Sequence, residues 1–209
     1  MFLMTASKNG VSAKELERQL GVTYKTAWRM AHQIRKLMNQ GGDLLSGIVE
    51  ADETFHGGHI KGRENRLENK SIVAGIVERK GRVRAKVVSD VKASTLLHGI
   101  SSNVKLGSTI YTDEYIPYRH LPKFGYIHDK VTHSAMEWVR AEVHTNSIEG
   151  FWYQLKRSVN GTFHQVSHQH LQAYVDEFSF RYNLRFSVTE SPIFPVLIEK
   201  AGERREQAD

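Results

Sequence analysis

The stretch "LSGIVEADETF", residues 45–55, alternates apolar and acidic side chains as a β-strand does. Successive side chains of a strand point to opposite faces, so Val49 and Ala51 share one face. Glu50 and Asp52 share the other. A carboxylate between two covered faces is costly unless it is paired or binds a metal ion. Asp52 is therefore the first candidate for a chemical role, and Glu50 is a candidate accessory acid.

Further strands and helices are expected after this first strand. Four more strands are expected in "SIVAGIVE", "RVRAKVVS", "STIYTDEY" and "FGYIH", residues 71–78, 82–89, 108–115 and 124–128. Helices are expected near residues 94–100 and at about 145–158 and 168–182. Three successive strands, a helix and a further strand indicate an α/β fold, with helices packed on a mixed sheet.

Two helices are expected near the N-terminus, in residues 12–20 and 22–38, joined at Gly21. Ser12 with Glu15 three residues later is a capping box that would start the first helix. Apolar residues recur in the second helix at helical spacing, at Ala27, Met30, Ile34 and Leu37. Two helices joined by a short turn that contains glycine form a helix-turn-helix.

A helix-turn-helix contacts DNA through the first part of its second helix. The residues expected to make these contacts are Tyr24, Lys25, Thr26 and Arg29. The net charge of +6, with 29 Lys and Arg against 23 Asp and Glu, makes nucleic acid the first candidate partner. The alternative is a helix pair that packs without binding anything.

The glycine pair in "NQGGDLLSG", residues 39–47, marks a linker. We therefore expect the helix-turn-helix in residues 1–40, the α/β domain in 41–190 and a C-terminal tail in 191–209. The chain has no cysteine, which excludes disulfides and cysteine zinc sites and fits a reducing cytoplasm. No apolar run approaches the roughly 20 residues that a membrane span needs.

Two polar segments have ordinary explanations. The loop "HGGHIKGRENRLENK", residues 56–70, is expected to be a solvated loop, with a DNA backbone contact as the alternative. The histidines of "HQVSHQH", residues 164–170, are expected to lie on a polar or DNA-facing surface. His168 and His170 are two residues apart on a helix, so they cannot bind one zinc ion together.

Asp113 follows the apolar part of the fourth strand, so its side chain is expected to emerge at the end of the sheet. With Asp52 and an acid on a helix it would form a set of three carboxylates. Such a set can hold two divalent ions for phosphoryl transfer, and Mg²⁺ prefers these hard oxygen ligands. Glu53 and Glu114 are the sequence neighbours of the two aspartates and are expected to point the opposite way.

The third acid is sought in "HTNSIEGFWYQLKR", residues 144–157. Asn146 and Glu149 have the spacing of a capping box, and either could also offer an oxygen to a metal ion. On a helical wheel, Glu149 and Lys156 border the same edge of the apolar stripe, whereas Asn146 lies further toward solvent. We predict Glu149 as the third ligand and Asn146 as the N-cap.

These motifs resemble those of a DDE transposase. The resemblance rests on Asp52 in "EADETFHGG", Asp113 in "YTDEY", the 35 residues between Asp113 and Glu149 (149 − 113 − 1) and Lys156 seven residues later. More narrowly, "VHTNSIEGFWYQLKRSVNGTFHQVS" followed by "EFSFRYNLR" resembles bacterial insertion-sequence transposases. The resemblance covers about residues 3–188.

The resemblance implies an RNase H-like catalytic domain behind a small helical domain, and a dependence on Mg²⁺ or Mn²⁺. It implies DNA strand cleavage and strand transfer at insertion-sequence ends by a homo-oligomer, at the nucleoid in the bacterial cytoplasm. The partners would be double-stranded transposon ends and target DNA. Lys156 would contact DNA near the scissile phosphate, with Arg157 beside it. In some members Asn takes the third position, which keeps Asn146 a catalytic candidate beside Glu149.

The chain departs from the family pattern at its start. Relatives commonly begin with a cysteine zinc ribbon, and this sequence has no cysteine. Two alternatives to a transposase therefore stay open. One is a trimmed or decayed copy that only binds DNA, and the other is an RNase H-like nuclease without strand transfer.

Overall fold

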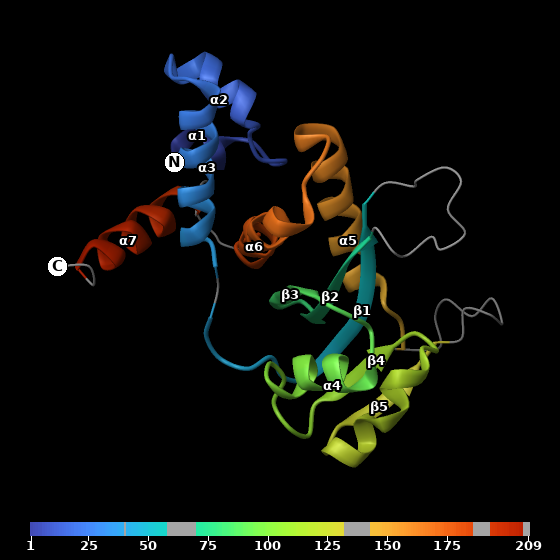
Figure 1. Ribbon diagram of the computed structural model, residues 1–209. Coiled ribbons are helices and arrows are strands. Elements are labelled where there is room, and N and C mark those ends of the chain that lie inside the picture. Colours follow the sequence, from blue (N-terminus) through green and yellow to red (C-terminus); the bar gives the residue numbers. More distant parts are fainter. Residues whose placement is uncertain (40, 58–69, 132–142, 186–192, 207–209) are drawn as a thin grey trace, which may run out of the picture. The chain divides into compact units, whose positions relative to one another are not determined.

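The computed structural model describes residues 1–39, 41–57, 70–131, 143–185 and 193–206 (Figure 1). Its helices are α1 (Phe2–Ala6), α2 (Ala13–Leu20), α3 (Tyr24–Leu37), α4 (Ala93–Ser101), η1 (Ile116–Phe124), α5 (Asn146–Ser158), η3 (Val159–Phe163), α6 (His168–Asn183) and α7 (Ile193–Glu206). Its strands are β1 (Ile48–His56), β2 (Ser71–Glu78), β3 (Val83–Val88), β4 (Thr109–Thr112) and β5 (Ile127–Lys130). None of the described helices is long and apolar enough to cross a membrane.

The chain forms two compact units, each of which is described by itself. The sheet unit is Gly42–Gln154, and the helical unit combines Met1–Gly41 with Leu155–Asp209. The division therefore falls inside α5 and places α6 with the N-terminal helices, whereas the sequence predicts that residues up to 190 belong with the sheet. The domain boundaries at 40 and 190 stay a prediction.

The five strands form one mixed sheet in the order β3-β2-β1-β4-β5. β1, β2 and β3 pair antiparallel as a meander, and β4 and β5 add to β1 in parallel. This is the RNase H-like arrangement, and it confirms the expected α/β fold. The fifth strand begins at Ile127, later than expected, because Phe124 and Gly125 end helix η1, where Gly125 takes a left-handed φ of 84°.

Helices cover both faces of the sheet within this unit. On one face, α4 and η1 pack over a buried cluster that includes Val49, Ala51 and Ile110. On the other face, α5 lies so close to β2 that a Cβ atom at Gly75 would sit 2.5 Å from the Trp152 ring. Glycine at residue 75 is therefore required for this close approach of helix and strand.

The helix pair α2–α3 begins and ends as its sequence predicts. The Ser12 hydroxyl accepts the Glu15 backbone N–H at 3.1 Å, and the Thr23 hydroxyl accepts that of Thr26 at 3.4 Å. Gly21 ends α2 with a left-handed φ of 64°. The predicted capping box forms only by half, because the Glu15 carboxylate pairs along the helix with Arg18 and Gln19 instead of reaching back. These contacts hold a short turn between two well-capped helices.

The core of the helical unit differs from the predicted stripe on α3. Ala27, Ala31, Arg35 and Met38 are the buried residues, whereas Met30 is 42% exposed. The stripe therefore follows two four-residue steps and one three-residue step, and it includes a buried arginine. The C-terminal segment, predicted only as a tail, forms helix α7, whose Leu197 is fully buried in the same core as Met38.

Arg35 is buried because α6 supplies a buried carboxylate. Its Nε donates to Glu177 at 2.8 Å, and its guanidinium lies 4.1 Å from the Tyr174 ring centroid. Arg181 donates to the other Glu177 oxygen at 2.8 Å and also to the backbone oxygens of Met4 and Ser7. Two buried arginines thus share one buried carboxylate and join α3, α6 and the N-terminal segment.

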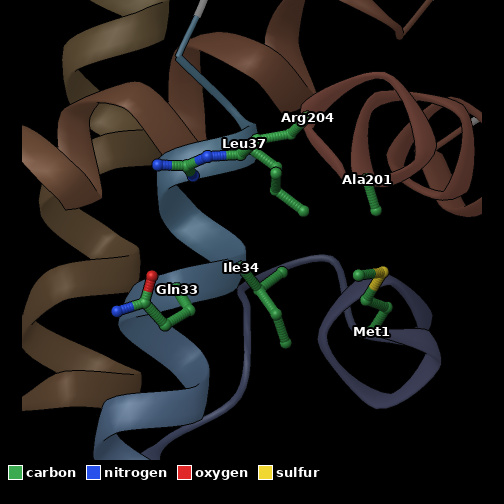
Figure 2. A pocket seen from close by; sticks show the side chains of 6 residues that line it. All are labelled: Met1, Gln33, Ile34, Leu37, Ala201 and Arg204. Carbon is green, nitrogen blue, oxygen red and sulfur yellow. The ribbon is translucent and has the colours of Figure 1, made fainter. Parts of the chain in front are cut away.

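A groove of 420 Å³ opens on the surface of the helical unit. Figure 2 shows Ile34 and Leu37 of α3 beside Met1 and Ala201, with Gln33 and Arg204 completing the lining. The side chains that line this groove include no acid. None of the predicted site acids therefore lines this groove.

Candidate functional site

Asp52 lies in β1 on the face covered by α5. Its Oδ2 accepts the indole N–H of Trp152 at 3.0 Å, and Trp152 is only 4% exposed. Asp52 and Gly75 are partners in the β1–β2 register, and the far edge of the indole packs over Gly75. The indole therefore lies across β1 and β2, with its ring over Gly75 of β2 and its N–H directed at Asp52 of β1.

Asp113 follows β4 directly, as predicted. β1 and β4 are parallel with Glu50 opposite Tyr111, so two residues further along each strand come Asp52 and Asp113. The Oδ1 atom of Asp113 accepts the backbone N–H of Tyr115 at 2.9 Å, a local turn that orients this carboxylate. Parallel pairing thus brings the two aspartates to neighbouring places on the sheet.

Glu50 is fully buried and holds the start of α5. Its carboxylate accepts the backbone N–H groups of Ser147 at 2.7 Å and Ile148 at 3.1 Å, and the Ser147 hydroxyl at 3.0 Å. Arg79 Nε donates to it at 2.8 Å, and His144 Nδ1 lies 3.3 Å away. With its oxygens engaged in this way, Glu50 is a structural anchor for α5, and the sequence hypothesis of an accessory acid is wrong.

The predicted cap of α5 also needs correction. The first intrahelical bond runs from the Glu149 N–H to the Thr145 carbonyl at 3.1 Å, so Thr145 is the N-cap and Asn146 is the first helical residue. The Thr145 hydroxyl donates to Glu149 Oε1 at 2.6 Å. Asn146 and Glu149 are both exposed, and Glu50 replaces the side chain that Asn146 was expected to supply.

The charges of the other two predicted acids act on Asp52. The pKa of Asp52 is raised to about 6, first by burial and then by the charges of Asp113 and Glu149, against the hydrogen bonds from the Glu53 backbone and Trp152. Charges at the end of β4 and on α5 therefore act on the acid of β1, and the grouping of the three acids in one site stays a prediction. A carboxylate that is buried and repelled in this way is typical of a functional site.

Glu53 points to the opposite face of β1, as expected. It accepts a hydrogen bond from the Tyr118 hydroxyl on the face covered by η1. The pKa of Glu53 is raised to about 7. Burial is the main cause and the charges of Asp52 and Asp113 add to it, whereas the hydrogen bond from Tyr118 acts in the opposite direction. The charges of the two aspartates therefore affect Glu53, although its side chain lies on the opposite face of β1.

These pKa values predict how the stability of the metal-free protein depends on pH. The carboxyl pKa values of Asp52 and Glu53 are raised in the folded state, so their contribution is full below the unfolded values of 3.8 and 4.5. It is lost as pH rises through about 6 and about 7. Urea unfolding in a chelating buffer should show a smaller loss of stability over this range for Asp52→Asn than for wild type. Equal losses of stability in the two proteins would contradict a raised pKa of Asp52 in the folded state.

The basic and aromatic residues predicted to meet DNA are all exposed. On α3 these are Tyr24, Lys25, Thr26 and Arg29. On the last turn of α5 they are Lys156 and Arg157. Their exposure agrees with a role in binding, which stays a prediction.

One histidine prediction needs revision. His170 packs against Trp28 and His32 of α3, with ring centroids 5.0 and 5.1 Å away, so it helps to join α6 to α3. The repeated contacts of α3 with α6 have no local sequence signal. Residues 58–69 of the polar loop lie outside the described residues, so the predicted role of this loop stays untested.

Two curated relatives are similar to this chain in sequence. An uncharacterised transposase-like protein of Haemophilus influenzae is 31% identical over 104 residues, which is 50% of this chain and 83% of that protein. A protein of transposable element ISH50 from Halobacterium salinarum is 25% identical over 81% of this chain. The chain covers 64% of the length of this halobacterial relative.

Solved structures of transposases and integrases are similar at low identity. The Mos1 strand transfer complex is 12% identical with a TM-score of 0.41, over 95% of this chain and 72% of that chain. The catalytic core domain of BIV integrase is 16% identical with a TM-score of 0.35, over 77% of this chain and 99% of that chain.

The family match agrees with the resemblance seen in the sequence. Residues 44–183, from the linker before β1 to the end of α6, match the ISXO2-like transposase domain. The matched residues are more than half of the chain and include all three acids together with the sheet that carries them. The protein therefore belongs to the ISXO2-like transposase domain family.

Proposed function

We propose that this protein cleaves DNA at the ends of an insertion sequence and joins those ends to target DNA in a divalent-metal-dependent reaction. The observation that carries the proposal is the parallel pairing of β1 with β4, which places Asp52 and Asp113 at neighbouring positions of an RNase H-like sheet. Family membership supports a transposase role. The alternatives are a nuclease that does not join ends and a copy that only binds DNA.

The acids suit a hard cation such as Mg²⁺ or Mn²⁺ by their chemistry. All three are carboxylates, and the pKa of Asp52 is raised first by burial and then by the negative charges of Asp113 and Glu149, which a dication would offset. Among the described residues, no three His, Asp or Glu side chains surround one point.

Asp52 and Asp113 would hold the cation from the sheet, and Glu149 or Asn146 would complete the set from α5. When bound, the cation lowers the pKa of water and offsets charge on the phosphate. In cleavage, a water oxygen attacks phosphorus and the bond to the 3′ oxygen breaks, which leaves a 3′-hydroxyl. In joining, that hydroxyl attacks a target phosphate and displaces another 3′ oxygen. Lys156 and Arg157 would contact the DNA phosphates.

The α2–α3 pair would serve as a helix-turn-helix that binds the element's ends. The exposed N-terminal half of α3 supports this role, because a recognition helix meets base edges there. An element has two ends, so we propose a homo-oligomer with one copy on each end. Its place in the cell would be the nucleoid.

The direct test uses the purified chain, labelled duplexes with the inverted repeats that flank its own gene, and a supercoiled target plasmid. With Mg²⁺ or Mn²⁺ we expect strand cleavage at the element boundary and a labelled joined product, both abolished by chelator. Cleavage without a joined product would favour the nuclease. Binding without cleavage at any metal concentration would favour the DNA-binding copy.

Removing basic side chains from α3 should weaken end binding. Lys25→Ala and Arg29→Ala are each expected to lower affinity and to reduce the salt slope by about one unit for each phosphate that the protein no longer touches. Lys105→Ala removes the same charge from an exposed position in the sheet unit and serves as the control. Gel-shift titrations over a range of salt measure both quantities. Unchanged slopes in both α3 variants would place end recognition elsewhere.

The choice between Glu149 and Asn146 as third ligand can be made by three substitutions. Glu149→Gln keeps an oxygen that can accept from Thr145 but removes the charge, so cleavage should fall by orders of magnitude in a folded protein. Asn146→Ala should keep full stability, because Thr145 and Glu50 provide the cap, and should keep partial activity. Asn146→Asp should also be active. Mg²⁺-dependent cleavage and thermal melting are measured together. A dead Asn146→Ala beside an active Glu149→Gln would reverse the two roles.

A further inference from the structure

Trp152 contacts Asp52 through a geometry that several residues fix together. Its indole N–H lies 3.0 Å from Asp52 Oδ2, in a position where Trp152 is 4% exposed. The far edge of the ring occupies the place of a side chain at residue 75, where a Cβ would be 2.5 and 2.6 Å from two ring atoms. The ring is therefore buried and packs directly against the backbone of β2 at Gly75.

The start of α5 is fixed to the same strand by a second contact. Glu50 precedes Asp52 by two residues on the same face of β1 and accepts the N–H groups of Ser147 and Ile148. Trp152 follows Ile148 by one helical turn, so its Cα position is set by that contact. Two independent constraints, the Glu50 anchor and the bare backbone at Gly75, thus direct one N–H group at one carboxylate oxygen.

We propose that Trp152 is a positioning residue for Asp52, whose indole N–H engages Oδ2 and holds the carboxylate in the orientation that binds the divalent cation. This inference rests on the proposed function and deepens it. A carboxylate in a strand can rotate about its last bond, and a hydrogen bond from a fixed ring removes that freedom. Hydrogen-bond partners of metal-binding carboxylates control metal affinity in this way.

The test measures Mn²⁺ binding by the full chain, from the loss of the free Mn²⁺ signal in electron paramagnetic resonance. Trp152→Phe keeps an aromatic ring but removes the donor, and we expect affinity to weaken by about 10- to 100-fold. Tyr126→Phe is the matched control, because it also removes one donor from a buried aromatic residue in the sheet unit. Gly75→Ala should weaken Mn²⁺ binding as well, since the added methyl group displaces the indole.

A second readout does not depend on the folding of Trp152→Phe. With Trp28 and Trp138 replaced by Phe, the remaining emission comes from Trp152, and Mg²⁺ should change it with a saturating curve. Asp52→Asn should abolish that change. The positioning role alone would be overturned if Trp152→Phe bound Mn²⁺ with wild-type affinity. It would also be overturned if the Trp152 emission did not change in a protein that binds Mg²⁺. A wild-type chain that binds neither cation would overturn the proposed metal chemistry and this inference with it.

Discussion

Asp52→Asn and Asp113→Asn are each expected to abolish end cleavage and joining while leaving end binding nearly unchanged. Both substitutions keep the size of the side chain and remove a negative oxygen that a divalent cation needs. Binding should survive because affinity for DNA comes mainly from basic contacts to phosphates. Asp52→Asn should also raise the melting temperature of the metal-free protein near pH 8, since a buried and repelled carboxylate is removed.

The measurements are cleavage of labelled ends across a metal titration, gel-shift affinity and thermal melting. Glu53→Gln is the control, because this acid is the neighbour of Asp52, is also half-buried, and faces the opposite side of β1 toward Tyr118. It should retain most of the cleavage activity. Normal cleavage by either aspartate variant at saturating metal would remove both acids from the proposed site.

Glu177→Gln is expected to destabilise the helical unit by about 3–5 kcal/mol, the usual cost of removing one partner from a buried ionic group. Glu177 is fully buried and serves Arg35 and Arg181, which are 2% and 7% exposed. Glutamine cannot accept charge-assisted bonds from both. Each guanidinium would then keep part of its charge unpaired in a buried position.

Urea unfolding followed by circular dichroism measures this loss. Asp176→Asn is the control from the adjacent residue of α6. Burial raises the pKa of Asp176, so loss of its charge should cost little. A similar small cost for both substitutions would mean that the two arginines find other acceptors and that Glu177 is not their main support.

The features that can be predicted from the sequence are those whose causes are local. Alternation locates β1, and the end of an apolar run places Asp113 beside it, because parallel pairing repeats the same offset in neighbouring strands. Helical spacing locates α5 and its acid. These signals depend on residues within a few positions of one another, which is why the elements that carry Asp52, Asp113 and Glu149 can be located from the sequence.

The errors share a different cause, which is contact between residues far apart in the chain. The local pattern predicts Asn146 as the cap of α5, but Glu50 performs that role from 97 residues away. Arg35 is absent from the apolar stripe that spacing predicts, and its burial depends on Glu177, 142 residues later. A charge on a helix carries no local mark of a distant partner, so periodicity assigns it to solvent.

The discontinuity of the helical unit has a consequence for synthesis. During translation α2 and α3 leave the ribosome first. Arg35 cannot form its ion pair with Glu177 until that residue emerges, 142 residues later. N-terminal segments usually fold first during translation, but here the first segment must wait for α6 to complete its core. The proposed DNA-reading helix therefore becomes fully stable only when nearly the whole chain exists. A nascent fragment that ends before α6 would contain that helix without its support, so the proposed recognition of the element would depend on completion of the chain.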